Sequence, residues 1–432
     1  MPAAPEPVSV DETARVFAGL TPHERIVLAV SGGSDSMALM ALYGRHRSIT
    51  PEAPDAVVVT VDHDLRAGSA EDAGFVVDAA ERLGFSAIVR RWTGDKPGSD
   101  IQAAAREARY RILREAASEQ GATAILTAHT RDDQAETFLM RLARGSGLKG
   151  LSAMPATRDL GGVELVRPLL GVGRDRLRAT LHEAGIGFRD DPSNGNTRFA
   201  RVRMRALMPA LASEGLDAKR LADTAARLAR ADRAVDAMVE RLAATHVEVH
   251  EGGFLSCPVA VLTEAEEEVR LRLLVAALGW VGGGVYGPRL EAAERAMARI
   301  IGDPVARMTL AGTRLVRRRD RVFVFREAGR AGLPRDHVAP GGSLVWDGRF
   351  RIALAPDAPD AVTVAPVGTA WRKLGGRGYD GRVPAAALAA VPAVYAGGDE
   401  AVAVPAFGHF ADPRWAGSIA TGFASPPPGR RL

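Results

Sequence analysis

The strongest constraint on the fold is an alternation of strand-like and helix-like segments in the first third of the chain. The apolar, β-branched run at residues 26–30 leads through a glycine-rich turn into a helical pattern at residues 36–47. The alternation then repeats, with strands expected at residues 56–61, 86–90 and 124–128 and helices at residues 69–83 and 101–118. Such a chain forms a parallel sheet covered by helices on both faces, and ligands bind beyond the carboxyl ends of its strands. Because the loops that begin at Ser31, Asp62 and His129 all leave from those ends, the sequence predicts one shared binding crevice.

The rest of the chain divides into two further parts. Helical spacing is expected at residues 216–247, 264–277 and 289–301, and a hairpin at residues 307–316 and 322–326 around a turn at 317–320. We therefore expect an α/β catalytic domain over residues 1–212, followed by a mainly helical domain over residues 213–330 that ends in this hairpin. Residues 331–432 are rich in proline and glycine and are expected to form a small C-terminal unit.

The glycine-rich turn, residues 31–36 (SGGSDS), has the features of a phosphate-binding loop. Gly32 and Gly33 have no side chain to block close approach, so backbone N–H groups can converge on a phosphate at the positive end of the helix dipole. The hydroxyl groups that can also donate to phosphate oxygens are those of Ser31, Ser34 and Ser36. Asp35 would repel a polyphosphate unless a cation lay between them, so its presence indicates Mg²⁺. The alternative, a plain serine and glycine turn, explains the glycines but not the acid.

Residues 28–36 (LAVSGGSDS) match neither the Walker pattern of P-loop NTPases nor the dinucleotide-binding pattern. They resemble the PP-loop of the N-type ATP pyrophosphatases, which likewise follows a strand and opens a helix. The resemblance implies an adenine nucleotide α-hydrolase-like fold that binds ATP and Mg²⁺. It also implies that ATP is cut between the α- and β-phosphates and that the substrate is activated as an adenylate.

Further motifs resemble one branch of that family, the tRNA(Ile)-lysidine synthetases, over roughly residues 20–330. These motifs are residues 61–66 (VDHDLR), 105–110 (AREARY), 128–137 (AHTRDDQAET), 141–148 (RLARGSGL), 190–194 (DDPSN) and 198–205 (RFARVRMR). The resemblance implies that Val61, His63 and His129 join the loop in binding ATP. Two positions depart from the family pattern, because Asp64 stands where glycine is usual and Val202 where asparagine is usual.

Two carboxylates in the motif at residues 128–137 are candidates for binding an amino acid. Asp133 and Glu136 are three residues apart, so on a helix they face the same way and can hold an ammonium group or a metal. The resemblance implies that both contact lysine and take part in catalysis. The alternative is that Asp132 caps the helix and Glu136 pairs with an arginine.

Two arginines of the motif at residues 105–110 are candidates for neutralising phosphates. Arg106 and Arg109 are three apart and share a helix face. The resemblance implies a catalytic role for Arg106 and a tRNA contact for Arg109. The alternative is a solvated face on which they pair with Glu107 or Glu115.

The motif at residues 198–205 supplies two more arginines. Arg201 and Arg205 are assigned to tRNA binding by the same resemblance. The alternative is a basic helix surface over core residues Met204 and Leu207.

The function implied by the resemblance is a two-step ligation. The wobble cytidine in the CAU anticodon of tRNA(Ile) would be adenylated by ATP, and the amine of L-lysine would then displace AMP to give lysidine. A single-stranded anticodon base can enter a pocket without opening a duplex. A formal net charge of +4 does not by itself identify a nucleic-acid partner.

Other interpretations remain open from the sequence. A PP-loop tRNA thiolase would need paired cysteines, whereas Cys257 is the single cysteine. GMP and asparagine synthetases need an ammonia-supplying unit or an N-terminal cysteine, and neither is visible. A non-catalytic adenine-nucleotide-binding module is the third alternative. The lone cysteine and the acidic N-terminal segment indicate a cytoplasmic protein with no membrane partner. The oligomeric state stays open, a homodimer included.

Overall fold

The computed structural model describes residues 4–64, 68–94, 101–189, 200–283, 287–375, 379 and 383–429. The chain forms two compact units, Met1–Asp232 and Arg233–Leu432. Parts of two expected motifs, residues 65–66 and 198–199, and the whole of a third, residues 190–194, lie outside the described residues. Within the described ranges, no helix combines the length and the apolar character that crossing a membrane requires.

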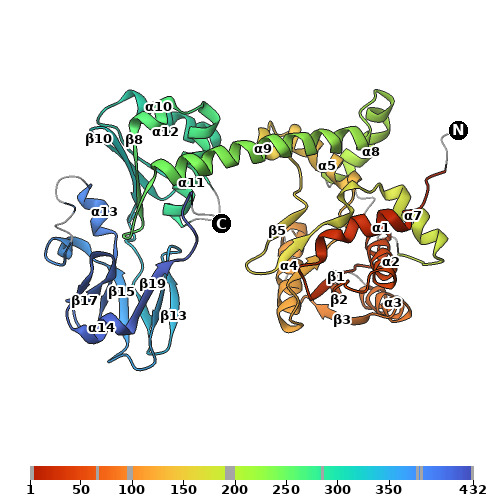
Figure 1. Ribbon diagram of the computed structural model, residues 1–432, viewed down its shortest axis with the longest axis horizontal. Coiled ribbons are helices and arrows are strands. Elements are labelled where there is room, and N and C mark those ends of the chain that lie inside the picture. Colours follow the sequence, from red (N-terminus) through yellow and green to blue (C-terminus); the bar gives the residue numbers. More distant parts are fainter. Residues whose placement is uncertain are drawn as a thin grey trace. The chain divides into compact units, whose positions relative to one another are not determined.

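The first unit is built on a six-stranded sheet (Figure 1). Its strand order is β3 (Ser86–Arg91), β2 (Asp55–Asp62), β1 (Arg25–Ala29), β4 (Ala124–Leu126), β6 (Glu164–Val166) and β5 (Thr157–Asp159). All neighbouring strands run parallel except β5, which is antiparallel to β6. The parallel sheet expected from the alternation is therefore confirmed. The carboxyl ends of β1, β2 and β4 lie at the same edge, as the sequence predicted.

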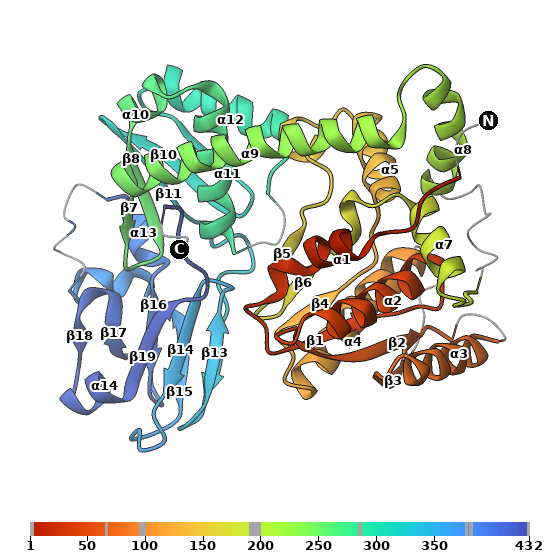
Figure 2. The same cartoon turned by 45° about the vertical axis from the view of Figure 1, so that its right-hand side comes forward.

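Helices cover both faces of this sheet (Figure 2). Along β1, Ile26 and Leu28 belong to one hydrophobic cluster and Val27 to another. The first cluster is completed by α1 (Val10–Phe17), α2 (Ser34–Ile49), α3 (Ser69–Arg82) and α7 (Arg174–Glu183), and the second by α4 (Ile101–Glu119). Because both faces are buried, these strands are apolar at consecutive positions.

The remaining elements of the first unit lie beside the sheet or follow it in the chain. They are η1 (Ala18–Leu20), α5 (Arg131–Leu142), α6 (Leu148–Leu151), η2 (Pro168–Gly171), α8 (Ala200–Ser213) and α9 (Ala218–His246), which continues into the second unit. Helix α2 begins at Ser34, whereas the sequence pattern placed its start at residue 36. As a result, Ser34 and Asp35 lie in the first helical turn.

Helix α1 is tied to α7 by an ion pair that should make stability depend on pH. Arg176 donates from Nη2 to Glu12 Oε2 at 2.8 Å and from Nη1 to Oε1 at 2.9 Å. This hydrogen bonding is the main reason why the pKa of Glu12 is lowered to about 2 from its ordinary value of 4.5. The stabilisation is therefore complete above the ordinary pKa, where the unfolded carboxyl is also ionised, and is lost as pH falls through about 2.

We expect Glu12→Gln to lower the free energy of unfolding by about 1 kcal/mol at pH 7, because the side chains of the pair are only 30% and 32% exposed but still screened by solvent. The loss should be clearly smaller at pH 3. Urea unfolding of both proteins at the two pH values measures it. Equal losses at both pH values would show that the effect does not come from ionised Glu12.

The described residues of the second unit form three antiparallel sheets. The first has the order β7 (Glu248–His250), β8 (Phe254–Pro258), β11 (Arg321–Arg326), β10 (Thr313–Arg318) and β9 (Arg307–Leu310). The second has the order β12 (Asp336–Val338), β15 (Val362–Pro366), β16 (Pro392–Tyr395), β17 (Ala401–Val404) and β18 (His409–Phe410), and the third β13 (Ser343–Trp346), β14 (Phe350–Leu354) and β19 (Ile419–Phe423). The helical elements are α10 (Val259–Glu264), α11 (Glu267–Gly282), α12 (Leu290–Gly302), η4 (Gly368–Arg372), α13 (Ala385–Ala389), η6 (Pro405–Phe407) and α14 (Pro413–Ser418).

The hairpin expected at residues 307–326 has three strands where the sequence analysis placed two. Leu310 pairs with Thr313, so the segment expected to be one strand turns at Ala311 and Gly312. Both residues have positive φ, +51° and +71°, as a tight two-residue hairpin turn requires. Arg318 pairs with Arg321, which makes the second turn shorter than the four residues expected.

The C-terminal segment shares a core with the part that precedes it in this unit. Phe254, Phe323 and Phe325 from the first sheet belong to the same hydrophobic cluster as Trp371 and Leu388. A buried ion-pair group reinforces the contact, because the Asp347 carboxylate accepts from Arg326 and Arg349. The boundaries at residues 212 and 330 stay predictions, and residues 331–429 pack as part of one compact unit.

Candidate active site

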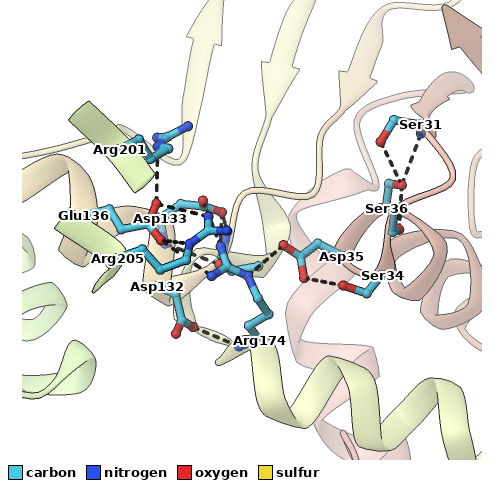
Figure 3. Close-up of polar contacts among 12 residues, drawn as sticks. Ser31, Ser34, Asp35, Ser36, Asp132, Asp133, Glu136, Arg174, Arg201 and Arg205 are labelled. Atoms are coloured by element: carbon cyan, nitrogen blue, oxygen red, sulfur yellow. Dashed lines mark hydrogen bonds and ion pairs between the residues drawn. The ribbon is translucent and has the colours of Figure 1, made fainter. Parts of the chain in front are cut away.

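Hydrogen bonds of its own serines stabilise the conformation of the loop at residues 31–36 (Figure 3). Gly33 is the N-cap of α2, and Gly32 has a positive φ of +86°. The Ser36 hydroxyl accepts from the Ser31 N–H at 3.1 Å and donates to the Gly33 carbonyl at 2.9 Å. Ser36 thus shapes the loop from inside. The N–H groups at the start of α2 remain the ones that can converge on an anion.

The two glycines of this loop should respond differently to alanine. Gly32→Ala forces a side chain into the left-handed region and should destabilise the fold by about 1–2 kcal/mol. At Gly33, with φ −72°, a Cβ would come no closer than 3.9 Å to Ser31 Oγ, so the fold tolerates it.

We therefore expect Gly33→Ala to keep the free energy of unfolding while weakening ATP binding about tenfold, about 1.4 kcal/mol, because a methyl group narrows the approach of phosphate to the loop. Urea unfolding and ATP calorimetry on both variants measure these effects. Unchanged ATP affinity in Gly33→Ala would contradict a phosphate contact at this position.

One arginine connects the loop to the acids of α5 (Figure 3). Arg174, the first residue of α7, was not singled out by the sequence analysis. Its Nε donates to Asp35 Oδ2 at 3.1 Å and its Nη2 to Asp133 Oδ1 at 3.2 Å, and its Nη1 lies 3.5 Å from Glu136 Oε1. Its backbone N–H donates to Asp132 Oδ2 at 2.8 Å. The structure therefore brings together the predicted residues Asp35, Asp133 and Glu136.

Glu136 is almost fully buried and surrounded by guanidinium groups. Arg205 Nε donates to its Oε1 at 2.8 Å, and Arg201 Nε lies 3.3 Å from its Oε2. With Arg174 this makes three arginines around a carboxylate that is 1% exposed. These contacts match the alternative in which Glu136 pairs with an arginine. They also place Arg201 and Arg205, assigned to tRNA from the sequence, against the candidate lysine site.

Asp133 has a double role at the start of α5. Its Oδ2 accepts from the Thr130 N–H at 2.8 Å, while the Thr130 hydroxyl caps the helix, so the cap is Thr130 and not Asp132. Burial raises the pKa of Asp133, but the Arg174 guanidinium and the Thr130 N–H outweigh this and hold the pKa below its ordinary value. At Asp35, burial outweighs Arg174 and raises the pKa. Asp35 and Asp133 thus contact the same arginine, but the pKa is raised at Asp35 and lowered at Asp133.

A second, basic group surrounds Tyr110. Arg106 Nη2 donates to the Tyr110 hydroxyl at 3.3 Å, and the Arg109 guanidinium lies 5.4 Å from the ring centroid. Arg167 is 4% exposed, and together with Arg106 and Arg109 it helps to lower the pKa of Tyr110 against the opposing effect of burial. Glu115 pairs with Arg111 instead, and in the described part of the chain no carboxylate forms an ion pair with Arg106 or Arg109. This group of positively charged side chains is suited to binding an anion.

Arg167 and Arg174 are the residues that sequence reasoning missed. Both follow β6, in a part of the chain where the sequence no longer shows a clear alternation of strand and helix patterns. His129, which was predicted, lies beside this basic group. Burial is the main reason why its pKa is lowered to about 3, so the imidazole is neutral.

The candidate ATP-binding residues Val61 and His63 lie at the end of β2 and directly after it. Val61 is in the strand, and the His63 ring packs edge-on against Trp92 with centroids 6.0 Å apart. Asp64, where the family usually has glycine, adopts the left-handed conformation with φ +50° and donates its N–H to Asp62 Oδ1 at 2.8 Å. Aspartate tolerates this conformation better than most residues, so the turn is kept without glycine.

The carboxylate of Asp35 would suit a magnesium ion that took its other ligands from phosphates. Among the described residues, no cluster of three or more histidine, cysteine, aspartate or glutamate side chains forms a ready metal cage. Mg²⁺ needs only one or two carboxylates when phosphates supply the other ligands. Asp35 offers one carboxylate within the loop, and this carboxylate already has a positively charged partner, Arg174. Asp35 is thus the residue that would hold Mg²⁺.

The loop at the end of β1 and the parallel sheet are the features of a PP-loop protein. Residues 6–211 match the family model of the PP-loop domain. The chain is 46% identical over 327 residues to a tRNA(Ile)-lysidine synthase of Bradyrhizobium diazoefficiens, covering 71% of this chain and 91% of that protein. It is 38% identical over 387 residues to the enzyme of the same name from Ruegeria pomeroyi, covering 90% of each chain. The chain therefore belongs to the tRNA(Ile)-lysidine synthase family.

A solved structure shows a more distant similarity. The U34-tRNA thiolase NcsA from Methanococcus maripaludis is 16% identical, with a TM-score of 0.44 over 51% of this chain and 79% of that chain. A similarity at this level carries no argument about activity, and it does not favour the thiolase alternative.

Proposed function

We propose that this chain joins L-lysine to C2 of the wobble cytidine in the CAU anticodon of tRNA(Ile), with ATP converted to AMP and pyrophosphate. The observation that carries the proposal is the meeting of Asp35 from the PP-loop with Asp133 and Glu136 from α5 around one guanidinium. A loop suited to anions would thereby lie next to carboxylates suited to an ammonium group. A nucleotide-activating step and an amine-transfer step need both.

In the first step, the cytosine O2 attacks the α-phosphorus of ATP and the bond from that phosphorus to the bridging oxygen breaks. The N–H groups at the start of α2 and the hydroxyl groups of Ser31 and Ser34 would hold the departing pyrophosphate. Mg²⁺ bound at Asp35 would supply charge neutralisation on the phosphates. Arg106, which lacks a carboxylate partner among the described residues, would neutralise the remaining phosphate charge.

In the second step, the lysine amine attacks C2 of the adenylated base and the bond from C2 to O2 breaks, releasing AMP. Asp133 and Glu136 would hold the ammonium group before it loses its proton. Among the described residues, the carboxylates of Asp35, Asp133 and Glu136 meet the guanidinium groups of Arg174, Arg201 and Arg205, and Asp132 accepts from the backbone N–H of Arg174, so the cluster would suit a further cation. Neutral His129 cannot compete as a cation.

The parts of the chain outside the PP-loop domain would bind the tRNA body. We assign this role to the regions 213–330 and 331–432, and to phosphate contacts by Arg109, Arg201 and Arg205 when these side chains leave their present partners. A cytoplasmic location is consistent with Cys257, whose burial raises its thiol pKa to about 11 and leaves it unreactive. A homodimer stays a prediction.

The test is an incorporation assay with the purified protein. A tRNA(Ile) transcript with the CAU anticodon is incubated with ATP, Mg²⁺ and one radiolabelled amino acid at a time, and the matched control is the same transcript with uridine at the wobble position. Incorporation from lysine alone, and into the cytidine transcript alone, is the expected result. Pyrophosphate release without incorporation would redirect the assignment to a sulfur or ammonia donor. No release at all would favour the non-catalytic nucleotide-binding module.

A further inference from the structure

A single side chain contacts the carboxylates that the proposed function gives to two different ligands. Arg174 donates to Asp35, the residue for the metal and nucleotide, and to Asp133, a residue for the lysine ammonium. It also approaches Glu136 to 3.5 Å. The three contacts use all three guanidinium nitrogens. The guanidinium of Arg174 therefore lies where the ammonium group of the substrate lysine is expected.

The backbone of Arg174 is fixed, so only its side chain can leave. Its N–H is bonded to Asp132 Oδ2 at 2.8 Å, and Leu177 and Leu181 anchor α7 in the main core of the first unit. Burial would lower the pKa of Arg174, but Asp133, Asp35 and Glu136 outweigh this and raise it, so the guanidinium stays charged. Release must come from a competing interaction and not from loss of its proton.

The two lysine-site acids differ in what else holds them. Glu136 keeps Arg201 and Arg205 as partners if Arg174 departs. Asp133, within the described residues, forms an ion pair with Arg174 and with no other arginine or lysine. If Arg174 departs, Asp133 is therefore left without an arginine or lysine partner among the described residues.

We propose that Arg174 is a positioning residue that occupies the ammonium subsite at Asp133 until nucleotide binds at Asp35, and thereby makes lysine bind after ATP. The inference rests on the proposed function. A divalent cation at Asp35 repels the guanidinium, and the adjacent polyphosphate attracts it. The side chain then turns towards the phosphates and uncovers Asp133. Linkage requires that nucleotide tightens lysine binding and that lysine tightens nucleotide binding by the same factor.

Calorimetry on the full chain tests this coupling without turnover. Lysine is titrated into the wild type with and without Mg²⁺ and a non-hydrolysable α,β-methylene analogue of ATP. We expect lysine to bind the wild type at least about fivefold more tightly with the analogue, within the range usual for coupled sites. In Arg174→Gln the two affinities should be equal, because Asp133 is uncovered in both states. Arg178→Gln, an exposed arginine of the same helix, is the matched control and should keep the wild-type ratio.

Two results would overturn the inference. One is a wild-type lysine affinity that does not depend on the analogue, a measurement that requires no variant to fold. The other is an Arg174→Gln protein with a wild-type unfolding midpoint that keeps the wild-type ratio. The incorporation assay on the same preparation separates the two proposals. Lysine incorporation without coupling would refute the role of Arg174 alone, whereas absence of incorporation would refute the proposed function and this inference with it.

Discussion

Replacing Asp35 by alanine is expected to lower the rate of tRNA-dependent pyrophosphate release about a thousandfold, roughly the loss seen when a group that stabilises transition-state charge is removed. Asp35 is the carboxylate of the PP-loop, and it lies in the first turn of α2, beside the N–H groups that would hold the phosphates. Without it, a metal would depend on phosphate oxygens and water alone. Single-turnover release of labelled pyrophosphate in the presence of tRNA measures the effect.

The control for this variant is Asp175→Asn, which removes an exposed acid on α7 next to Arg174 and should leave the rate unchanged. Nucleotide-free lysine binding in Asp35→Ala should be no weaker than the nucleotide-free binding of the wild type, because Asp133 and Glu136 remain. A wild-type rate of pyrophosphate release in Asp35→Ala would show that the metal is held elsewhere. Loss of lysine binding as well would show that Asp35 belongs to both subsites.

The parts of the site that the sequence predicted are those coded by contiguous residues. The PP-loop is a strand, two glycines and a helix start, so its geometry follows from residues 26–36 alone. The alternation of strands and helices likewise settles the parallel sheet, because each segment carries its own period. Asp133 and Glu136 could be paired because three residues along a helix place them on one face.

Arg174 could not be found in this way. It is 139 residues from Asp35 and 41 from Asp133 in sequence, and no local period marks it. Its role appears only when α7 packs on the sheet and brings its first residue to the carboxyl ends of the strands. The same reason hides the pairing of Glu136 with Arg201 and Arg205, since α8 is a separate segment.

Two other features of the sequence indicate where an element begins or ends. Ser9 and Glu12 form a capping box, a pattern that predicts the start of α1. Ala311 and Gly312 interrupt the run of β-like residues at the turn between β9 and β10, and glycine there signals a hairpin. The start of α1 and the turn between β9 and β10 are both marked by short local signals and not by apolar periodicity.

Glu136→Gln is expected to have the second large effect, on both stability and the lysine step. The substitution keeps the shape but removes the charge that holds Arg174, Arg201 and Arg205 around a carboxylate 1% exposed. Breaking a buried ion pair from one side typically costs about 3–5 kcal/mol, and the lower end, about 3 kcal/mol, applies here because the Arg201 and Arg205 side chains are 36% and 39% exposed. We expect a loss of this size in urea unfolding. Glu115→Gln, whose partner Arg111 is exposed, should lose no more than about 0.5 kcal/mol.

The two half-reactions separate stability from chemistry in this variant. At a temperature where the protein remains folded, we expect Glu136→Gln to lose lysine transfer to adenylated tRNA at least about tenfold more than it loses pyrophosphate release, which rests on the PP-loop. Labelled lysine incorporation and pyrophosphate release in one reaction give the ratio directly. Equal loss of both steps would mean that Glu136 acts only by keeping α5, α7 and α8 together. In that case Asp133, the acid that Arg174 covers, would be left as the candidate ligand of the lysine ammonium.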